Sequence, residues 1–214
     1  MKCLRNARQR LIGTVSLAIT AIALTTGAYA QEAVTEQHAL VTDPVTTVVT
    51  LQRALVAAAA LDDVEARFAA LLPEIRATHD LRGIARLTIR RDFDQFAPEE
   101  QAAFIAAFER LSVMNYAARF TGLSQESFRN VGSKSIGSDR AEVESFIRNG
   151  AGEEISLDYV LEHSVDGWRI INIVADGVSD LALKRAEYRA ILASGTAADL
   201  IAAIEAQAEA LAEG

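Results

Sequence analysis

The chain has little of what most catalytic and metal-binding sites are built from. Its 214 residues include one cysteine, three histidines and one tryptophan, and 6% of them are aromatic. The sequence contains no Gly-x-Ser-x-Gly elbow, no phosphate-binding loop, no His-Glu-x-x-His helix and no Rossmann glycine pattern. We therefore predict no catalytic residue, no metal site and no cofactor.

Residues 1–30 have the pattern of a secretory signal peptide. Four basic side chains are followed by an uncharged, mostly apolar run from Leu11 to Leu24. Ala28 and Ala30 are small residues at the two positions that signal peptidase recognises, which predicts cleavage before Gln31. The apolar run is shorter than the roughly 20 residues that a membrane-spanning helix needs, so the sequence favours cleavage over anchoring.

Cleavage would change both the redox chemistry and the charge of the chain. It would remove Cys3, the sole cysteine, and with it any thiol or disulfide. It would also remove four basic residues and no acidic one, which changes the formal net charge from −8 to −12. Nucleic acid is not an expected partner, because contact with phosphates requires dense Lys and Arg. Residues 31–43 are predicted to be a mobile tail, and residues 44–214 a single domain.

Apolar residues spaced three to four positions apart predict a helical N-terminal half. One such stripe runs from Pro44 to Ala60, and Asp43 before it is a good cap. A second stripe begins at Val64. A third, short helix is expected from Leu81 to Ile89, and Ala97-Pro98 should open the longest helix.

The second half predicts a four-stranded antiparallel meander followed by two helices. Strands are expected at Phe128–Ile136 and Arg140–Arg148, and a third is indicated by alternating apolar residues from Ile155 to Leu161. The segment 168–174 is apolar on both faces and should be a central strand, joined to the third by a hairpin at Asp166-Gly167. C-terminal helices are expected after Ser179 and from Thr196. The fold class is thus α+β, with helices covering one face of the sheet.

An ordered set of residues carries a resemblance to a known family: Tyr159, Gly167-Trp168, Asp176-Gly177-Val178-Ser179, Arg185, Tyr188 and Ile191-Leu192. In this order they resemble the MlaC, or toluene-tolerance, family of periplasmic phospholipid-binding proteins. The resemblance extends more loosely back to about Val48. The chain departs from the family pattern where His79 replaces an aromatic residue, and again between Thr88 and Phe93.

The resemblance implies a soluble periplasmic carrier that shuttles phospholipid between the outer and inner membranes for an ABC transport system. It also implies two partners, an outer-membrane lipoprotein complex and an inner-membrane ABC transporter with its periplasmic substrate-binding ring. Some relatives are associated with hopanoid synthesis, so a hopanoid-type cargo is an alternative. Two exposed acyl chains cost on the order of 20 kcal/mol in water, so a carrier needs an apolar cavity, expected here between sheet and helices.

We expect apolar side chains of the helices and of the third and fourth strands to bind the lipid, with one cation at the pocket mouth. The predicted lipid-binding residues are Phe68, Leu72, Ile75, Phe104, Phe108, Leu111, Leu157, Tyr159, Leu161, Trp168 and Arg185. If the third strand lines the cavity, Leu161→Trp should displace lipid without unfolding the protein. The alternative for Arg185 is a surface pair with Asp176 or Asp180.

The rival hypothesis is a small cone-shaped α+β enzyme with an apolar pocket. Its acid–base residues would be Asp158, Tyr159 and Tyr116. Asp158 and Tyr159 are adjacent on a strand and should point to opposite faces, which disfavours this hypothesis. A carboxylate buried at the bottom of a pocket would favour it. His79 and His163 are predicted to be structural rather than catalytic.

Overall fold

The computed structural model describes residues 43–148 and 151–213. The signal peptide predicted for residues 1–30 and the tail predicted for residues 31–43 lie outside the described residues, except for Asp43. Within the part that the structure describes, no helix combines the length and the apolar composition that crossing a membrane would require.

Four helices form the N-terminal half, as the apolar periodicity predicted. They are α2 (Pro44–Ala59), α3 (Val64–Thr78), α4 (Leu81–Ile89) and α5 (Pro98–Arg119), with a 3-10 turn η1 (Arg90–Gln95) before α5. The first three helices each begin after an aspartate, and each aspartate accepts a backbone N–H of the first turn: Asp43, Asp63 and Asp80. These caps fix the starts of the helices, so the starts could be predicted from local sequence alone.

The sheet has five strands, not the four that the sequence predicted. Its strands are β1 (Phe128–Ser135), β2 (Arg140–Arg148), β3 (Glu154–Ser164), β4 (Gly167–Ala175) and β5 (Val178–Ser179), with a short 3-10 turn η2 (Gln125–Ser127) before them. The strands pair antiparallel in sequence order, so the predicted meander is confirmed and β5 is added at one edge. A two-residue strand shows too few positions for an alternating pattern, which is why it was missed.

Two tight hairpins bracket β4. The predicted turn between β3 and β4 is confirmed, but its loop is one residue earlier: Ser164 pairs with Gly167, so Val165 and Asp166 form the loop. Asp176 and Gly177 form the second hairpin loop, with φ values of 46° and 78°. Positive φ at both loop positions is what a type I′ turn requires. This turn directs the chain into α6 within two residues.

Two C-terminal helices complete the chain, α6 (Asp180–Leu192) and α7 (Ala197–Glu213). The predicted cap of α6 is confirmed, because the Ser179 hydroxyl accepts a hydrogen bond from the Ala182 N–H at 3.1 Å. Ser179 is therefore both the last residue of β5 and the residue that starts α6. This double use ties the position of α6 to the edge of the sheet.

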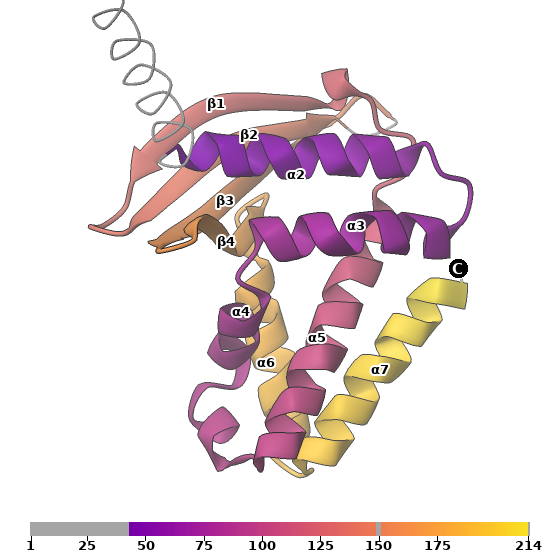
Figure 1. Cartoon of the computed structure of the whole chain (residues 1–214), viewed down its shortest axis with the longest axis vertical. Coiled ribbons are helices and arrows are strands. Elements are labelled where there is room, and N and C mark those ends of the chain that lie inside the picture. The colour runs from indigo at the N-terminus through magenta and orange to yellow at the C-terminus, as the bar shows by residue number, and fades with distance from the viewer. Residues whose placement is uncertain (1–42, 149–150, 214) are drawn as a thin grey trace, which may run out of the picture. The chain divides into compact units, whose positions relative to one another are not determined.

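The helices lie on one side of the sheet, as Figure 1 shows. α2 lies against β1, β2 and β4, and α3 packs against α2 and α5. α5 then packs against α7, while α4 packs against α6. On β3 the predicted inward face is confirmed: Leu157, Tyr159 and Leu161 are all buried. In the segment of β4 predicted to be covered on both sides, the neighbours Ile170 and Ile171 are both buried, at the point where the pairing of β4 with β3 shifts register.

Candidate functional site

A cavity of about 330 Å³ lies between β4, β5 and the helices α4, α5 and α6. Twelve of the twenty residues that line it are apolar: Leu81, Ile84, Phe108, Phe120, Leu157, Ile170, Ile171, Ile173, Ala175, Val178, Leu181 and Leu183. Two of these, Val178 and Leu183, are more than half exposed, at 52% and 59%. The cavity therefore has a buried apolar interior and an apolar rim that reaches the surface.

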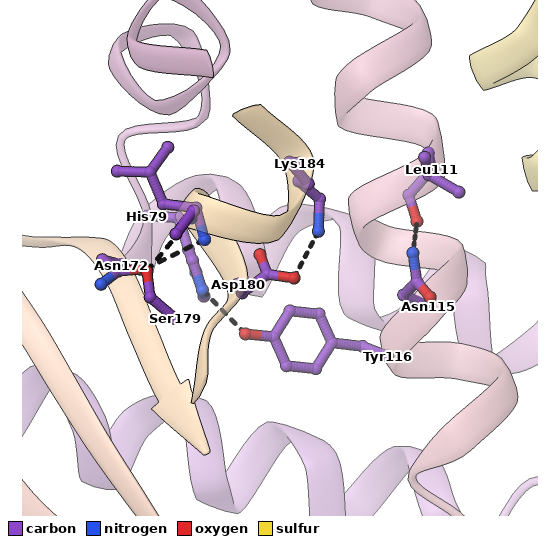
Figure 2. A network of polar contacts seen from close by, with 10 residues as sticks. His79, Leu111, Asn115, Tyr116, Asn172, Ser179, Asp180 and Lys184 are labelled. Atoms are coloured by element: carbon purple, nitrogen blue, oxygen red, sulfur yellow. Dashed lines mark hydrogen bonds and ion pairs between the residues drawn. The ribbon is translucent and has the colours of Figure 1, made fainter. Parts of the chain in front are cut away.

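Polar side chains of the cavity wall come from α5, from the start of α6 and from β4, as Figure 2 shows. Asn115 donates from its Nδ2 to the Leu111 carbonyl at 3.0 Å. Asn172 accepts at its Oδ1 from the Ser179 hydroxyl and from the Leu181 N–H, each at 3.1 Å. Asn172 thus holds the start of α6 against β4. These two amides are engaged in supporting the local backbone.

His79 and Tyr116 form a partly buried polar contact in the cavity wall, with Nε2 of His79 3.0 Å from the Tyr116 hydroxyl (Figure 2). The Thr78 hydroxyl donates to the Glu74 carbonyl at 2.8 Å, so it can only accept from Nδ1 of His79 at 3.0 Å. His79 is then protonated on Nδ1, and its Nε2 accepts a hydrogen bond from the Tyr116 hydroxyl. This arrangement requires a neutral imidazole.

Burial explains the ionisation of both rings. It lowers the pKa of His79 from 6.5 to about 4, because the charged imidazolium would lose its hydration. Burial also raises the pKa of the Tyr116 hydroxyl, and Tyr159 and Asp180 nearby add to that effect. Both groups are therefore uncharged at neutral pH. They present a hydrogen-bonded but electrically neutral patch to the cavity.

One ion pair stands in the cavity wall. Nζ of Lys184 lies 2.5 Å from Oδ1 of Asp180, one helical turn earlier on α6. The Lys184 side chain is 15% exposed and that of Asp180 is 57% exposed, so the pair leads from the interior to the mouth. Arg119, exposed at the last turn of α5, also lines the cavity. Arg119, Asp180 and Lys184 are the charged residues of a wall that is otherwise neutral.

Of the eleven residues predicted to bind lipid, Phe108 and Leu157 line this cavity. The others lie elsewhere. Tyr159 and Leu161 are close-packed in the core on the same face of β3 as Leu157. Phe104 packs against Phe93, Phe96 and Tyr188, outside the cavity wall. Also outside it are Phe68, Leu72, Ile75, Leu111 and Trp168, all of which pack in or against the core.

Arg185 also lies outside the cavity wall. Its Nε and Nη2 both donate to the Leu87 carbonyl, at 3.2 and 3.1 Å, so it braces the last turn of α4. The alternative surface pair is not formed either, because Asp180 is engaged with Lys184 and Oδ1 of Asp176 accepts from the Ser156 N–H. Burial, together with the like charges on Arg90 and Arg189, lowers the pKa of Arg185.

Asp158 is not brought together with Tyr116 and Tyr159, the other two residues that an acid–base enzyme would use. Asp158 lies on the outer face of the sheet, where partial burial and the neighbouring Glu142 and Glu144 raise its pKa. Tyr159 lies on the opposite face, as predicted, and Tyr116 is in the cavity. The carboxylate that lines the cavity is Asp180, which lies at the mouth and is more than half exposed.

Of the other ionisable residues singled out in the sequence, His163 is exposed, and its ring meets that of Trp168 edge-on at 5.0 Å. Within residues 43–148 and 151–213, no three His, Cys, Asp or Glu side chains are grouped as metal ligands.

Several cavity residues were missed at the level of sequence. Ile170, Ile171 and Ile173 belong to the strand that was predicted to be covered on both faces, and that pattern was a usable signal. Leu181 and Lys184 lie on the first turns of α6, and Lys184 directly precedes Arg185, the cation predicted to bind lipid. Tyr116 had been weighed only as a catalytic residue.

Comparison with known proteins places these features in context. The family model described as MlaC protein matches residues 46–206. Among solved structures, a phospholipid-binding protein from Ralstonia solanacearum, in complex with a phospholipid at 1.53 Å resolution, superposes with a TM-score of 0.70. The two chains are 21% identical, and the match covers 80% of this chain and 99% of that one, which establishes a shared fold. A search of curated proteins found no match.

Proposed function

The chain belongs to the MlaC family, and we propose that it binds a phospholipid with its acyl chains in the cavity and carries it through the periplasm. The observation that carries this proposal is the composition of the cavity wall, which is mostly apolar and is charged only at Arg119, Asp180 and Lys184. Such a wall suits a ligand with a long apolar part and a charged head. The similar Ralstonia protein, whose structure contains a phospholipid, supports this assignment.

The energetic case rests on the transfer of methylene groups out of water. Each buried CH₂ contributes about 0.8 kcal/mol, so sheltering two acyl chains is worth on the order of 20 kcal/mol. At 330 Å³ the cavity lies near the lower end of the roughly 300–1,000 Å³ found for small-ligand sites. A lipid with two long chains is larger than that, so we expect the walls to move apart on binding. Part of a chain would also lie along the apolar rim at Val178 and Leu183.

The proposed carrier acts by binding and release, without a covalent step. Phospholipid would pass between the outer and inner membranes, with an outer-membrane lipoprotein complex at one end. At the other end would be an ABC transporter with its periplasmic substrate-binding ring. Residues 1–30 would direct export and then be removed, so N-terminal sequencing of the periplasmic protein should start at Gln31. An intact Met1 on periplasmic material would contradict that part of the proposal.

In this proposal Phe108 and Leu157 contact the acyl chains directly. The other predicted apolar residues act behind the wall: Leu161 and Tyr159 back the sheet side, and Phe104 backs Phe108, whose ring centroid lies 6.4 Å away. Arg185 would influence binding only through the position of α4.

Mass spectrometry of lipid that co-purifies with the native protein tests the proposal. We expect phospholipid at close to one molecule per chain. A triterpenoid in its place would favour the hopanoid alternative, and protein free of any lipid, unable to take lipid from vesicles, would refute the proposal.

A cavity-filling substitution connects that measurement to the site. Ile173→Trp adds volume inside the cavity from β4, and we expect a folded protein that has lost most of its lipid. Val131→Trp is the matched control, because Val131 is a 55% exposed residue of β1 that lies outside the cavity wall. Equal lipid content in the two variants would place the cargo somewhere else.

A further inference from the structure

We propose that Lys184 binds the phosphodiester group of the lipid, and that Asp180 holds Lys184 in place until the lipid arrives. This inference rests on the proposed function and concerns the same cavity. It starts from the ion pair in the cavity wall, where Nζ of Lys184 and Oδ1 of Asp180 are 2.5 Å apart.

The two members of the pair differ in their access to water. The Lys184 side chain is 15% exposed, whereas the Asp180 side chain is 57% exposed. An ammonium withdrawn from water needs an anionic or hydrogen-bonding partner. A half-exposed carboxylate can return to water with little loss, because solvent-accessible ion pairs are only weakly stabilising. Asp180 is therefore an exchangeable partner, and another anion at the mouth can replace it.

The chemistry of lysine fits a phosphodiester. Its ammonium carries three donors on a flexible stem, so it can turn from a carboxylate oxygen to a phosphate oxygen without moving the backbone. Arg119 on the last turn of α5 supplies a second cation at the cavity. Together with Asp180, these side chains give the cavity wall a net charge of one positive unit, which matches the single negative charge of a phosphodiester.

The position of the pair favours recognition of the phosphate itself over recognition of the headgroup beyond it. Lys184 lies among the apolar residues Leu181 and Leu183 of the same helix, which line the same cavity. Acyl chains inside and a phosphodiester at Lys184 would leave the rest of the headgroup beyond the exposed rim. We therefore infer that the protein takes single-phosphodiester lipids with different headgroups and does not take a lipid that lacks the phosphate.

The adjacent cation on α6 cannot perform this role. Both Nε and Nη2 of Arg185 are bonded to the Leu87 carbonyl, and Arg185 does not line the cavity. A backbone carbonyl within a helix is fixed and cannot withdraw into water as the Asp180 carboxylate can.

The test compares three lipids with the same two oleoyl chains: phosphatidylglycerol, phosphatidylethanolamine and diacylglycerol, each offered in vesicles to delipidated protein. Uptake is measured as lipid bound per chain after separation from the vesicles. Lys184→Gln should lower uptake of both phospholipids about tenfold, the loss expected for one charge-assisted hydrogen bond. It should leave the low uptake of diacylglycerol unchanged. Lys184→Arg should retain most of the phospholipid uptake.

Asp180→Asn separates this role from a merely structural one. If Asp180 competes with the phosphate, its neutralisation should leave phospholipid uptake at or above that of the wild type. If the ion pair only stabilises the first turn of α6, Asp180→Asn and Lys184→Gln break the same contact and should lower uptake of all three lipids alike. Arg189→Gln is the control, since it removes one cation from the exposed side of the same helix.

Two results would overturn the inference: phospholipid uptake by Lys184→Gln equal to that of the wild type, or parallel losses in Lys184→Gln and Asp180→Asn. Failure of the proposed function would look different, because the wild type itself would then take up neither phospholipid. Should Lys184→Gln fail to fold, Asp180→Asn still decides the matter, because its phospholipid uptake should stay at or above that of the wild type if Asp180 competes with the phosphate and should fall if the ion pair is only structural.

Discussion

The buried imidazole of His79 should make the stability of the domain depend on pH in a defined window. Burial lowers its pKa from 6.5 in the unfolded chain to about 4 in the native protein. Between these values the unfolded state binds more protons than the folded state, so the free energy of unfolding falls as the pH falls. The stability is fully present above pH 6.5 and is lost progressively towards pH 4.

The magnitude follows from the difference between the two pKa values. One pKa unit corresponds to about 1.4 kcal/mol, so the loss attributable to His79 should approach about 3 kcal/mol by pH 4. Carboxylates titrate in part of the same range, so the wild type alone cannot isolate this contribution. His79→Gln serves as the reference, because it retains a polar side chain of similar reach and has no proton to bind in this window.

The assay is urea unfolding at a series of pH values from 7 to 4, followed by the fluorescence of Trp168, the sole tryptophan. The difference in unfolding free energy between wild type and His79→Gln should shrink steadily below pH 6.5 and change sign if it is small at neutral pH. If the unfolding free energies of the two proteins change with pH in parallel, the argument is refuted. Water or a movement of Tyr116 would then stabilise the charged imidazolium in the folded state.

Four further substitutions test the packing of the domain. Gly83→Ala should destabilise the protein by about 1 kcal/mol, despite the better helix propensity of alanine, because its Cβ would lie 2.0 Å from Oδ2 of Asp80, the cap of α4; thermal melting that shows a gain in stability would contradict this. Tyr188→Phe should leave stability unchanged or raise it by about 1 kcal/mol, since the buried Tyr188 hydroxyl has no hydrogen-bond partner among the described residues. Tyr116→Phe should lower stability by a similar amount, because Nε2 of His79 loses the hydroxyl that donates to it. If urea unfolding shows that both tyrosine variants are stabilised or that both are destabilised, these hydrogen-bond assignments are wrong. Leu161→Trp should cost roughly 1–3 kcal/mol or more through overpacking, because Leu161 is fully buried outside the cavity, and a melting temperature equal to that of the wild type would show that space exists there.

Local chemistry made most of the secondary structure predictable. Helix starts follow from single side chains that accept backbone N–H groups within three residues, as Asp43, Asp63 and Asp80 do. The alternating face of β3 follows from burial on one side of a pleated strand. The exception is β5, whose Asp176-Gly177 turn was visible. An Asp-Gly pair is a strong hairpin signal, and it could have indicated that the chain returns along β4 before α6 begins.

The location of the cavity could not be predicted in the same way. Periodicity indicates that Leu157, Tyr159 and Leu161 turn inward, but it is silent on what each one meets inside. Leu157 lines the cavity, whereas Leu161, four residues along the same face, is close-packed. That difference depends on which helices approach each end of the sheet, and it arises from tertiary packing. A pattern that predicts burial therefore does not distinguish residues that line the cavity from residues that are close-packed in the core.

The two neighbouring cations of α6, Lys184 and Arg185, also show that sequence periodicity does not predict what a side chain contacts. Successive residues on a helix point about 100° apart, so Lys184 and Arg185 face different elements even though both are long, basic and partly buried. Arg185 is the cation that the sequence predicts at the pocket mouth, but the structure gives that residue a fixed carbonyl partner on α4. Lys184 instead faces the cavity and is paired with the Asp180 carboxylate, which is exposed enough to be solvated by water when the pair separates. A cation whose partner can be exchanged is available to a ligand, whereas a cation bonded to a backbone carbonyl is not. The partner, more than the residue type, therefore determines which of the two cations can bind a phosphate.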